Sequence, residues 1–230
     1  VRYYSYHLPY TEHLPDDYDL RRLIAEYYGM TTWVDDTVGR MLAALDDTGL
    51  AENTVVIFTS DHGDNLGSHG RVQKGTTNEE SIRVPLIARV PDALAPGAAA
   101  RGGNATQVGC LVDLMPTLLD LADVPVPDHV HGVSLANVLR GGCATTDRPH
   151  AFVETGGEVA IRTPEHLYAL RRNADRTLAD RTHFFTDLAA DPYQLQNLAD
   201  TGQQADVAAQ FDSLLRAWHA ATPYMDAPGA

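Results

Sequence analysis

The feature that most constrains the fold is a continuous β-favouring run, Thr54-Val55-Val56-Ile57-Phe58-Thr59, which leads directly into Ser60-Asp61-His62-Gly63. An apolar run without polar alternation is typical of a strand buried on both faces, as at the centre of a parallel sheet. In open α/β sheets, ligands bind at the carboxyl ends of such strands. The run therefore predicts an α/β fold with a candidate site at residues 60–63.

Two helical patterns and a second strand accompany this run. Apolar residues at three-to-four spacing predict a long amphipathic helix over Asp16 to Leu45, ending near Gly49. The same spacing predicts a helix over Val108 to Ala122, in which Pro116 causes a kink or marks the first turn. Val84 to Ala88 is a second apolar strand. These elements indicate an α/β core.

The pattern changes after Gly141-Gly142. Short strand-like runs separated by turn residues predict a small antiparallel sheet, and helical spacing over Gln203 to Ala220 predicts a closing helix. The runs are Ala151–Val153, Val159–Ile161, Leu167–Leu170 and His183–Phe185. We expect a core over residues 1–142, a C-terminal subdomain over 143–222 and a tail over 223–230.

The composition is strongly acidic. The formal net charge is −14, which disfavours nucleic-acid binding through a basic face and adhesion to an anionic membrane. No apolar run has transmembrane length, so no membrane insertion is expected. Aspartate outnumbers glutamate 23 to 8, a bias that a halophile's cytoplasm favours and that a GC-rich genome also produces. An exported enzyme fits this composition too, so localisation stays open, with the cytoplasm favoured.

Asp61 and His62 form the first candidate site. After a buried strand, a carboxylate and an imidazole can bind one divalent cation, the carboxylate as a hard ligand and the imidazole as a borderline one. The alternative is structural: an aspartate that caps a turn and a histidine held by a backbone carbonyl. Because Ca²⁺ takes about 6–8 oxygen ligands, two residues do not complete a shell.

Lys74 is the single lysine in a chain with 16 arginines. Lysine is a compact point charge, whereas arginine is a planar fork. An ammonium at this position suggests contact with one anionic oxygen beside a metal; the alternative is a solvated surface lysine.

Among the other polar residues of this region, one is a candidate for substrate contact and four are expected to support the loop. His69 could meet a substrate or donate a proton, although a loop histidine is more often structural. Four charged residues are expected to support the loop, with Glu79 or Glu80 capping a helix or pairing with Arg83. The four are Asp64, Glu79, Glu80 and Arg83.

From Thr54 to Ile87 the sequence resembles the metal-and-substrate segment of sulfatases, which belong to the alkaline phosphatase superfamily. The motif reads Thr-Val-Val-Ile-Phe-Thr-Ser-Asp-His-Gly-Asp-Asn-Leu-Gly-Ser-His-Gly and then Lys-Gly-Thr-Thr-Asn-Glu-Glu-Ser-Ile-Arg-Val-Pro-Leu-Ile. Further segments are similar to the family's long helix, its next helix and loop, and its C-terminal signature: Tyr27–Arg40, Val112–Leu119, Gly132–Leu135 and Phe185–Leu198. The resemblance implies an α/β, alkaline phosphatase-like fold with an incomplete mixed or parallel sheet flanked by helices.

The resemblance also implies the chemistry of a sulfuric ester hydrolase. Asp61 and His62 would ligate a divalent cation, usually calcium; many sulfatases have asparagine at the second position. Lys74 would contact the sulfate ester oxygens, and His7 would be the family's substrate histidine. In the family, the number of residues between the segment that holds this histidine and the long helix is usually larger than in this chain. The expected partner is a sulfate-ester small molecule or a sulfated sugar, while the oligomeric state stays open.

One departure from the family bears on activity. Sulfatases carry a Cys/Ser-x-Pro-x-Arg segment near the N-terminus, whose Cys or Ser is oxidised to formylglycine, and neither Cys110 nor Cys143 lies in such a segment. The family's paired aspartates are missing as well, and both features belong upstream of Val1. We therefore expect the C-terminal part of a sulfatase, inactive by itself and weak in calcium binding. The alternatives are a phosphate or phosphonate ester hydrolase of the same superfamily and a catalytically silent binding module.

Overall fold

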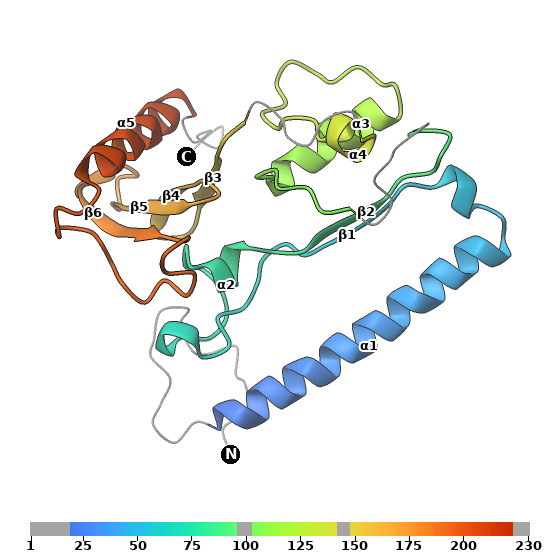
Figure 1. Ribbon diagram of the computed structural model, residues 1–230, viewed down its shortest axis with the longest axis horizontal. Coiled ribbons are helices and arrows are strands. Elements are labelled where there is room, and N and C mark those ends of the chain that lie inside the picture. The colour runs from blue at the N-terminus through green and yellow to red at the C-terminus, as the bar shows by residue number, and fades with distance from the viewer. Residues whose placement is uncertain (1–18, 96–102, 142–147, 223–230) are drawn as a thin grey trace. The chain divides into compact units, whose positions relative to one another are not determined.

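The structure is a computed structural model that describes residues 19–95, 103–141 and 148–222. These residues form two compact units (Figure 1). The first unit comprises the described residues up to Lys74 and those from Arg83 to Arg148. The second comprises Gly75–Ile82 and the described residues from Pro149 onward. A short piece of chain that follows Lys74 therefore belongs to the C-terminal unit.

The long N-terminal helix is present. α1 runs from Leu20 to Asp47, and the Asp19 carboxylate caps it by accepting the Arg22 N–H at 3.0 Å. After the helix, Gly49 has φ +70°, a left-handed conformation that glycine adopts without strain. Of the helix residues only Leu23 is buried, and the other apolar side chains are half-buried or exposed. No helix in the described part of the chain has the length and apolar character needed to cross a bilayer.

β1 (Val56–Thr59) and β2 (Leu86–Arg89) form an antiparallel pair in which Val56 lies opposite Arg89. Among the described residues, the expectation of a parallel partner and of burial on both faces is wrong for β1. Its side chains are half-buried or, for Phe58, exposed, and Ile87 on β2 is 63% exposed. The physical reason is that an apolar run reports the need for burial and not the direction of the neighbouring strand.

A buried carboxylate organises the helices of the first unit. The 3₁₀ helix Leu111–Asp113 leads into α3 (Leu114–Leu121), and Pro116 lies in the first turn of α3, as one of the two sequence-based alternatives expected. Asp113 accepts the N–H groups of Cys110 and Val133, both at 2.8 Å, and both branches of the Arg148 guanidinium. One aspartate thus joins α3 to the segment before α4 (Ala136–Leu139).

The chain between β1 and Lys74 is closed into a loop. The Asn65 N–H and its side-chain amide both donate to the Gln73 carbonyl at 2.8 Å. The Asp64 carboxylate accepts the Gln73 N–H at 3.0 Å. We call these three bonds the loop neck. Asn65 is fully buried, and the 3₁₀ turn Ser68–Gly70 forms the tip of the loop.

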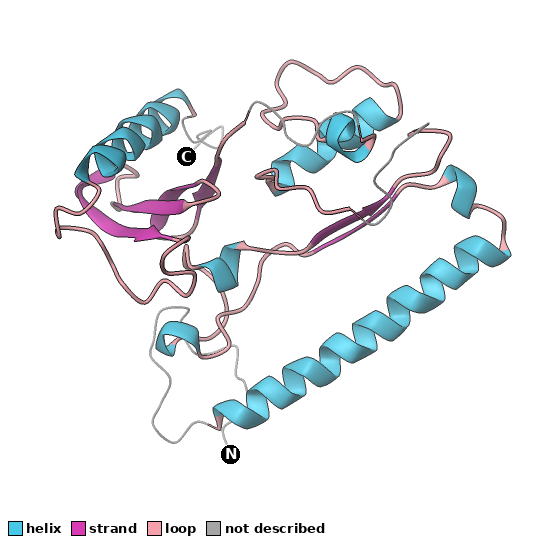
Figure 2. Cartoon of the chain, in the orientation of Figure 1, coloured by secondary structure: helices cyan, strands magenta, loops and turns pink. Residues whose placement is uncertain are grey.

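The second unit is the predicted antiparallel sheet with its closing helix (Figure 2). Its strands are β3 (Ala151–Glu154), β4 (Glu158–Arg162), β5 (His166–Arg172) and β6 (Leu178–Asp187), in that spatial order. α5 (Ala205–Ala221) packs on one face of the sheet. The core between them consists of Val159, Ile161, Tyr168, Leu170, Phe185, Phe211 and Leu215.

The opposite face of this sheet receives the inserted piece of chain. Small side chains, Ala160 and Ala169, lie there beside Leu167, and Ile82 packs against them. Ile82 ends α2 (Glu79–Ile82), a single helical turn. The segment 75–82 is therefore part of the packing of the C-terminal sheet.

The loop neck can be tested by Asn65→Ala. This change removes the buried amide that donates to Gln73, and losing such a bond is worth about 1–2 kcal/mol. We expect the 66–72 loop to be cleaved about 5–30-fold faster in limited proteolysis, because that energy raises the population of the open loop. Asn53→Ala, which truncates an exposed asparagine of the same unit, is the control. Equal cleavage rates in the two variants would contradict the neck.

Candidate functional site

Asp61 and His62 follow β1 by one residue and face each other. The Asp61 Oδ1 accepts the backbone N–H of His62 at 3.0 Å, which leaves Oδ2 for another partner. That second oxygen lies 3.4 Å from the Nε2 of His62. The Asp61 side chain is 83% exposed and the His62 side chain 38% exposed, so both are accessible to an incoming ion.

The hydrogen bonds of His62 determine which ring nitrogen is available. Its Nδ1 lies 2.8 Å from the carbonyl oxygen of Gly63. Because a carbonyl only accepts, Nδ1 carries the proton and Nε2 holds a lone pair in the neutral ring. A metal-binding histidine commonly donates its other N–H to a carbonyl in this way. Both features of the structural alternative, a bonded aspartate and a histidine held by a carbonyl, are therefore present and are compatible with a metal ligand.

The donor set fits a divalent cation. Nε2 of His62 and Oδ2 of Asp61 both carry lone pairs and lie 3.4 Å apart, so one cation could take both atoms as ligands. Within the described ranges, no third Asp, Glu, His or Cys side chain joins them into a metal-binding group. The remaining ligands would have to come from elsewhere, as the sequence indicated.

The backbone next to Lys74 is bonded to the segment that follows Asp61 and His62. It follows Gln73, whose N–H and carbonyl are held by Asp64 and Asn65 at the loop neck. The segments that carry Asp61-His62 and Lys74 therefore run side by side at the base of the loop. The Lys74 side chain is half-buried.

The other residues predicted for the site differ in their positions and contacts. His69 lies at the tip of the loop with φ 56°, and its Nε2 atom is buried. His7 lies outside the described residues. Glu79 lies in the first turn of α2 and forms an ion pair with Arg162 at 2.8 Å, a partner that the sequence did not indicate. Asp64 supports the loop, as expected.

Asn65 supports the loop, and the sequence did not indicate it. It follows the motif aspartates, and its amide closes the loop neck from a fully buried position. A buried asparagine beside a glycine-rich loop signals a backbone that needs an internal hydrogen-bond partner. The sequence shows an asparagine at this position but not its burial, which depends on where the loop begins and ends.

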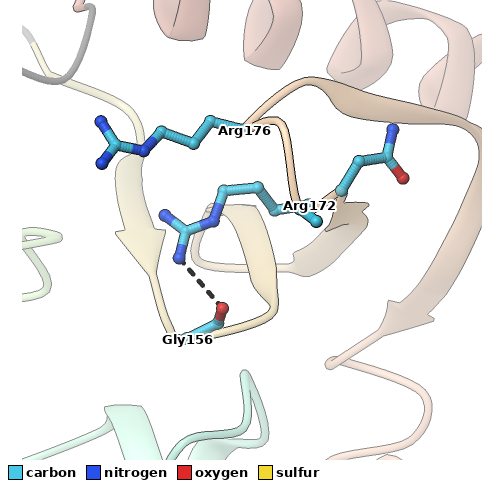
Figure 3. A pocket seen from close by; sticks show the side chains of 5 residues that line it. Gly156, Arg172 and Arg176 are labelled. Atoms are coloured by element: carbon cyan, nitrogen blue, oxygen red, sulfur yellow. Dashed lines mark hydrogen bonds between the residues drawn. The ribbon is translucent and has the colours of Figure 1, made fainter.

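A separate hollow of about 360 Å³ lies in the second unit (Figure 3). Arg172 and Arg176 line it together with residues of two turns. The Arg172 guanidinium donates to the carbonyls of Thr155 and Gly156, both at 3.0 Å, so it ties the β3–β4 turn to the end of β5. None of the residues predicted to carry chemistry lines this hollow.

Comparison with protein families places these residues in a known context. Residues 3–124 match the Sulfatase family, and residues 67–221 match the family described as N-sulphoglucosamine sulphohydrolase, C-terminal. An arylsulfatase of Clostridium perfringens is 34% identical over 187 residues, which cover 79% of this chain and 37% of that protein. The chain thus spans well under half the length of this relative.

Solved structures agree with the family match. A protein in complex with its substrate D-glucosamine-2-N,6-O-disulfate is 30% identical, with a TM-score of 0.69, over 81% of this chain and 38% of that one. The phosphonate monoester hydrolase of Agrobacterium radiobacter is also 30% identical, with a TM-score of 0.73, over 88% of this chain and 42% of that one. The fold is therefore the α/β fold of the alkaline phosphatase-like enzymes, and the chain belongs to the sulfatase family.

Proposed function

We propose that this chain supplies the metal-and-substrate part of a sulfuric ester hydrolase. The observation that supports the proposal is the loop neck, which ties the residue before Lys74 to the segment that follows the Asp-His pair. In that pair, Asp61 Oδ2 and His62 Nε2 lie 3.4 Å apart. A cationic side chain and two cation ligands carried by one loop would suit an anionic ester that bridges an ammonium and a metal.

The proposed cofactor is a divalent cation, with Ca²⁺ as the first candidate. Asp61 Oδ2 and His62 Nε2 would hold it, and it would polarise the sulfuryl oxygens. An imidazole ligand also suits transition metals, so Mn²⁺ and Zn²⁺ belong in the same test. A formylglycine in a segment upstream of this chain would supply the nucleophile.

Lys74 would neutralise charge on the transferred sulfuryl group. An ammonium makes a point contact with a single oxygen, which leaves the other oxygens for the cation. His69 and His7 are further candidates for substrate contact. The chain by itself is proposed to be inactive, since it has no formylglycine segment.

Two substrate classes follow from the neighbouring structures. A sulfated sugar is the first to test, because the neighbour bound to D-glucosamine-2-N,6-O-disulfate is 30% identical to this chain. A phosphonate monoester is the second, because the phosphonate monoester hydrolase of Agrobacterium radiobacter is equally similar. Parallel assays with a sulfate ester and a phosphonate ester of the same alcohol separate them.

Lys74→Ala in the complete enzyme should reduce kcat/KM about 10²–10³-fold, because it removes one charge contact to the transition state. Lys74→Arg should recover only part of the loss, since a planar fork does not replace a point charge. Arg181→Ala, which removes an exposed cation of β6, is the matched control and should leave the rate unchanged. An unchanged rate in Lys74→Ala would exclude the proposed role.

Calorimetry tests the cation site. The 230-residue chain should bind Ca²⁺ with a Kd of about 1 mM or weaker, because two ligands leave most of the shell to water. Asp61→Asn should abolish this weak binding, whereas Asp200→Asn, at an exposed ion pair of the second unit, should not. Tight stoichiometric binding by the chain alone would show that its cation site is already complete.

A further inference from the structure

Thr77 lies three residues after Lys74, and one carboxylate holds both its N–H and its hydroxyl. The Thr77 N–H donates to the Glu158 Oε2 at 3.2 Å, and the Thr77 hydroxyl donates to the same oxygen at 2.8 Å. Both residues are buried, Thr77 at 3% and Glu158 at 8% exposure. Bonds of this kind to a charged, desolvated acceptor are stronger than bonds between neutral groups.

His183 occupies the other oxygen of the same carboxylate. Its Nε2 lies 3.0 Å from the Glu158 Oε1. Burial raises the pKa of Glu158, but the hydrogen bonds from His183 and Thr77 outweigh it and lower the pKa below its ordinary value. Glu158 is therefore ionised at neutral pH and acts as an anionic acceptor for Thr77.

The rest of the segment 75–82 is also fixed to the C-terminal sheet. The Glu79 N–H donates to the Gln194 side chain at 2.7 Å, and the Glu79 carboxylate receives two bonds from Arg162. Ile82 packs on the face of the sheet. Of these anchors, the bond to Glu158 is the nearest to Lys74 along the chain.

The chain is held on either side of Lys74, each side within its own unit. Gln73 is held at the loop neck of the first unit, and Thr77 is held by Glu158 within the second. Lysine has a flexible four-carbon stem, so an ordered backbone reduces the freedom that must be lost when the ammonium meets an anion. A supporting shell of this kind is what holds a functional group in a productive position.

We propose that Glu158 is a positioning residue, which, by holding Thr77, fixes the backbone from which Lys74 reaches the ester. This inference rests on the proposed function of Lys74. Glu158 contacts Thr77 and His183, and it acts on the reaction only through Lys74.

The single lysine gives a direct readout of this restraint. In the 230-residue chain, labelling with nitrogen-15 lysine produces one backbone amide signal, which belongs to Lys74. We expect an order parameter of about 0.85 in the unchanged chain and below about 0.6 in Thr77→Val and in Glu158→Gln. Thr77→Ser, which restores the hydroxyl, should recover the high value, and Asp200→Asn should keep it. An order parameter that stays high in both variants would overturn the inference.

A double-mutant cycle in the complete enzyme separates positioning from general stability. With 4-nitrophenyl sulfate as the probe, Thr77→Val should lower kcat about tenfold in the unchanged background and less than about twofold in the Lys74→Ala background. Equal effects in both backgrounds would mean that Thr77 does not act through Lys74, and would overturn the inference. Should Thr77→Val not fold, Glu158→Gln replaces it in the cycle.

The double-mutant cycle also distinguishes a failure of the proposed function of Lys74 from a failure of the positioning role of Glu158. If Lys74→Ala leaves kcat unchanged, the proposed function of Lys74 fails. If Lys74→Ala slows the enzyme while Thr77→Val does not, the function stands and the positioning role of Glu158 fails.

Discussion

The hydrogen bonds that hold Gln73 are the constraint on which the candidate site depends. The Asp64 carboxylate accepts the Gln73 N–H, and Asn65 donates two N–H groups to the Gln73 carbonyl, so the backbone before Lys74 is tied to the segment that carries Asp61 and His62. Without this closure, Lys74 and the Asp-His pair would be joined only by the flexible polar loop between them. With it, the segments that carry them meet at the base of one loop.

Charge in this protein is handled differently on the surface and in the interior. The net charge of −14 resides mostly on exposed aspartates, whereas the buried carboxylates serve as acceptors for several donors at once. Asp113 collects two backbone N–H groups and Arg148 in the first unit, and Glu158 collects Thr77 and His183 in the second. Each accepts several hydrogen bonds and so orders the chain around it. A substrate sulfate would be the opposite case, an anion that requires cations, and Lys74 is the residue proposed to meet it.

The helices and strands that local apolar periodicity specifies could be predicted from the sequence. The strands of the second unit, α5 and the long helix α1 appear close to their predicted spans, because the apolar spacing and flanking turn residues are local signals. The partner of β1 and the attachment of residues 75–82 to the C-terminal sheet were not predictable. Thr77 and Glu158 lie 81 residues apart, and a buried glutamate at the start of a strand does not reveal which hydroxyl it will meet. Asp61, His62 and Lys74 were selected as candidates through motif spacing, whereas Asn65 and Glu158, which hold the chain on either side of Lys74, were not.

The most direct test of the account is a crystal structure of the complete protein grown with a divalent cation and sulfate. We expect the cation on Asp61 Oδ2 and His62 Nε2, with one sulfate oxygen on the cation and another within hydrogen-bond distance of the Lys74 ammonium, about 2.7–3.2 Å. The Glu158 carboxylate should hold Thr77 in that structure as well. A cation bound without Asp61 and His62, or a Lys74 ammonium directed away from the sulfate, would contradict the account.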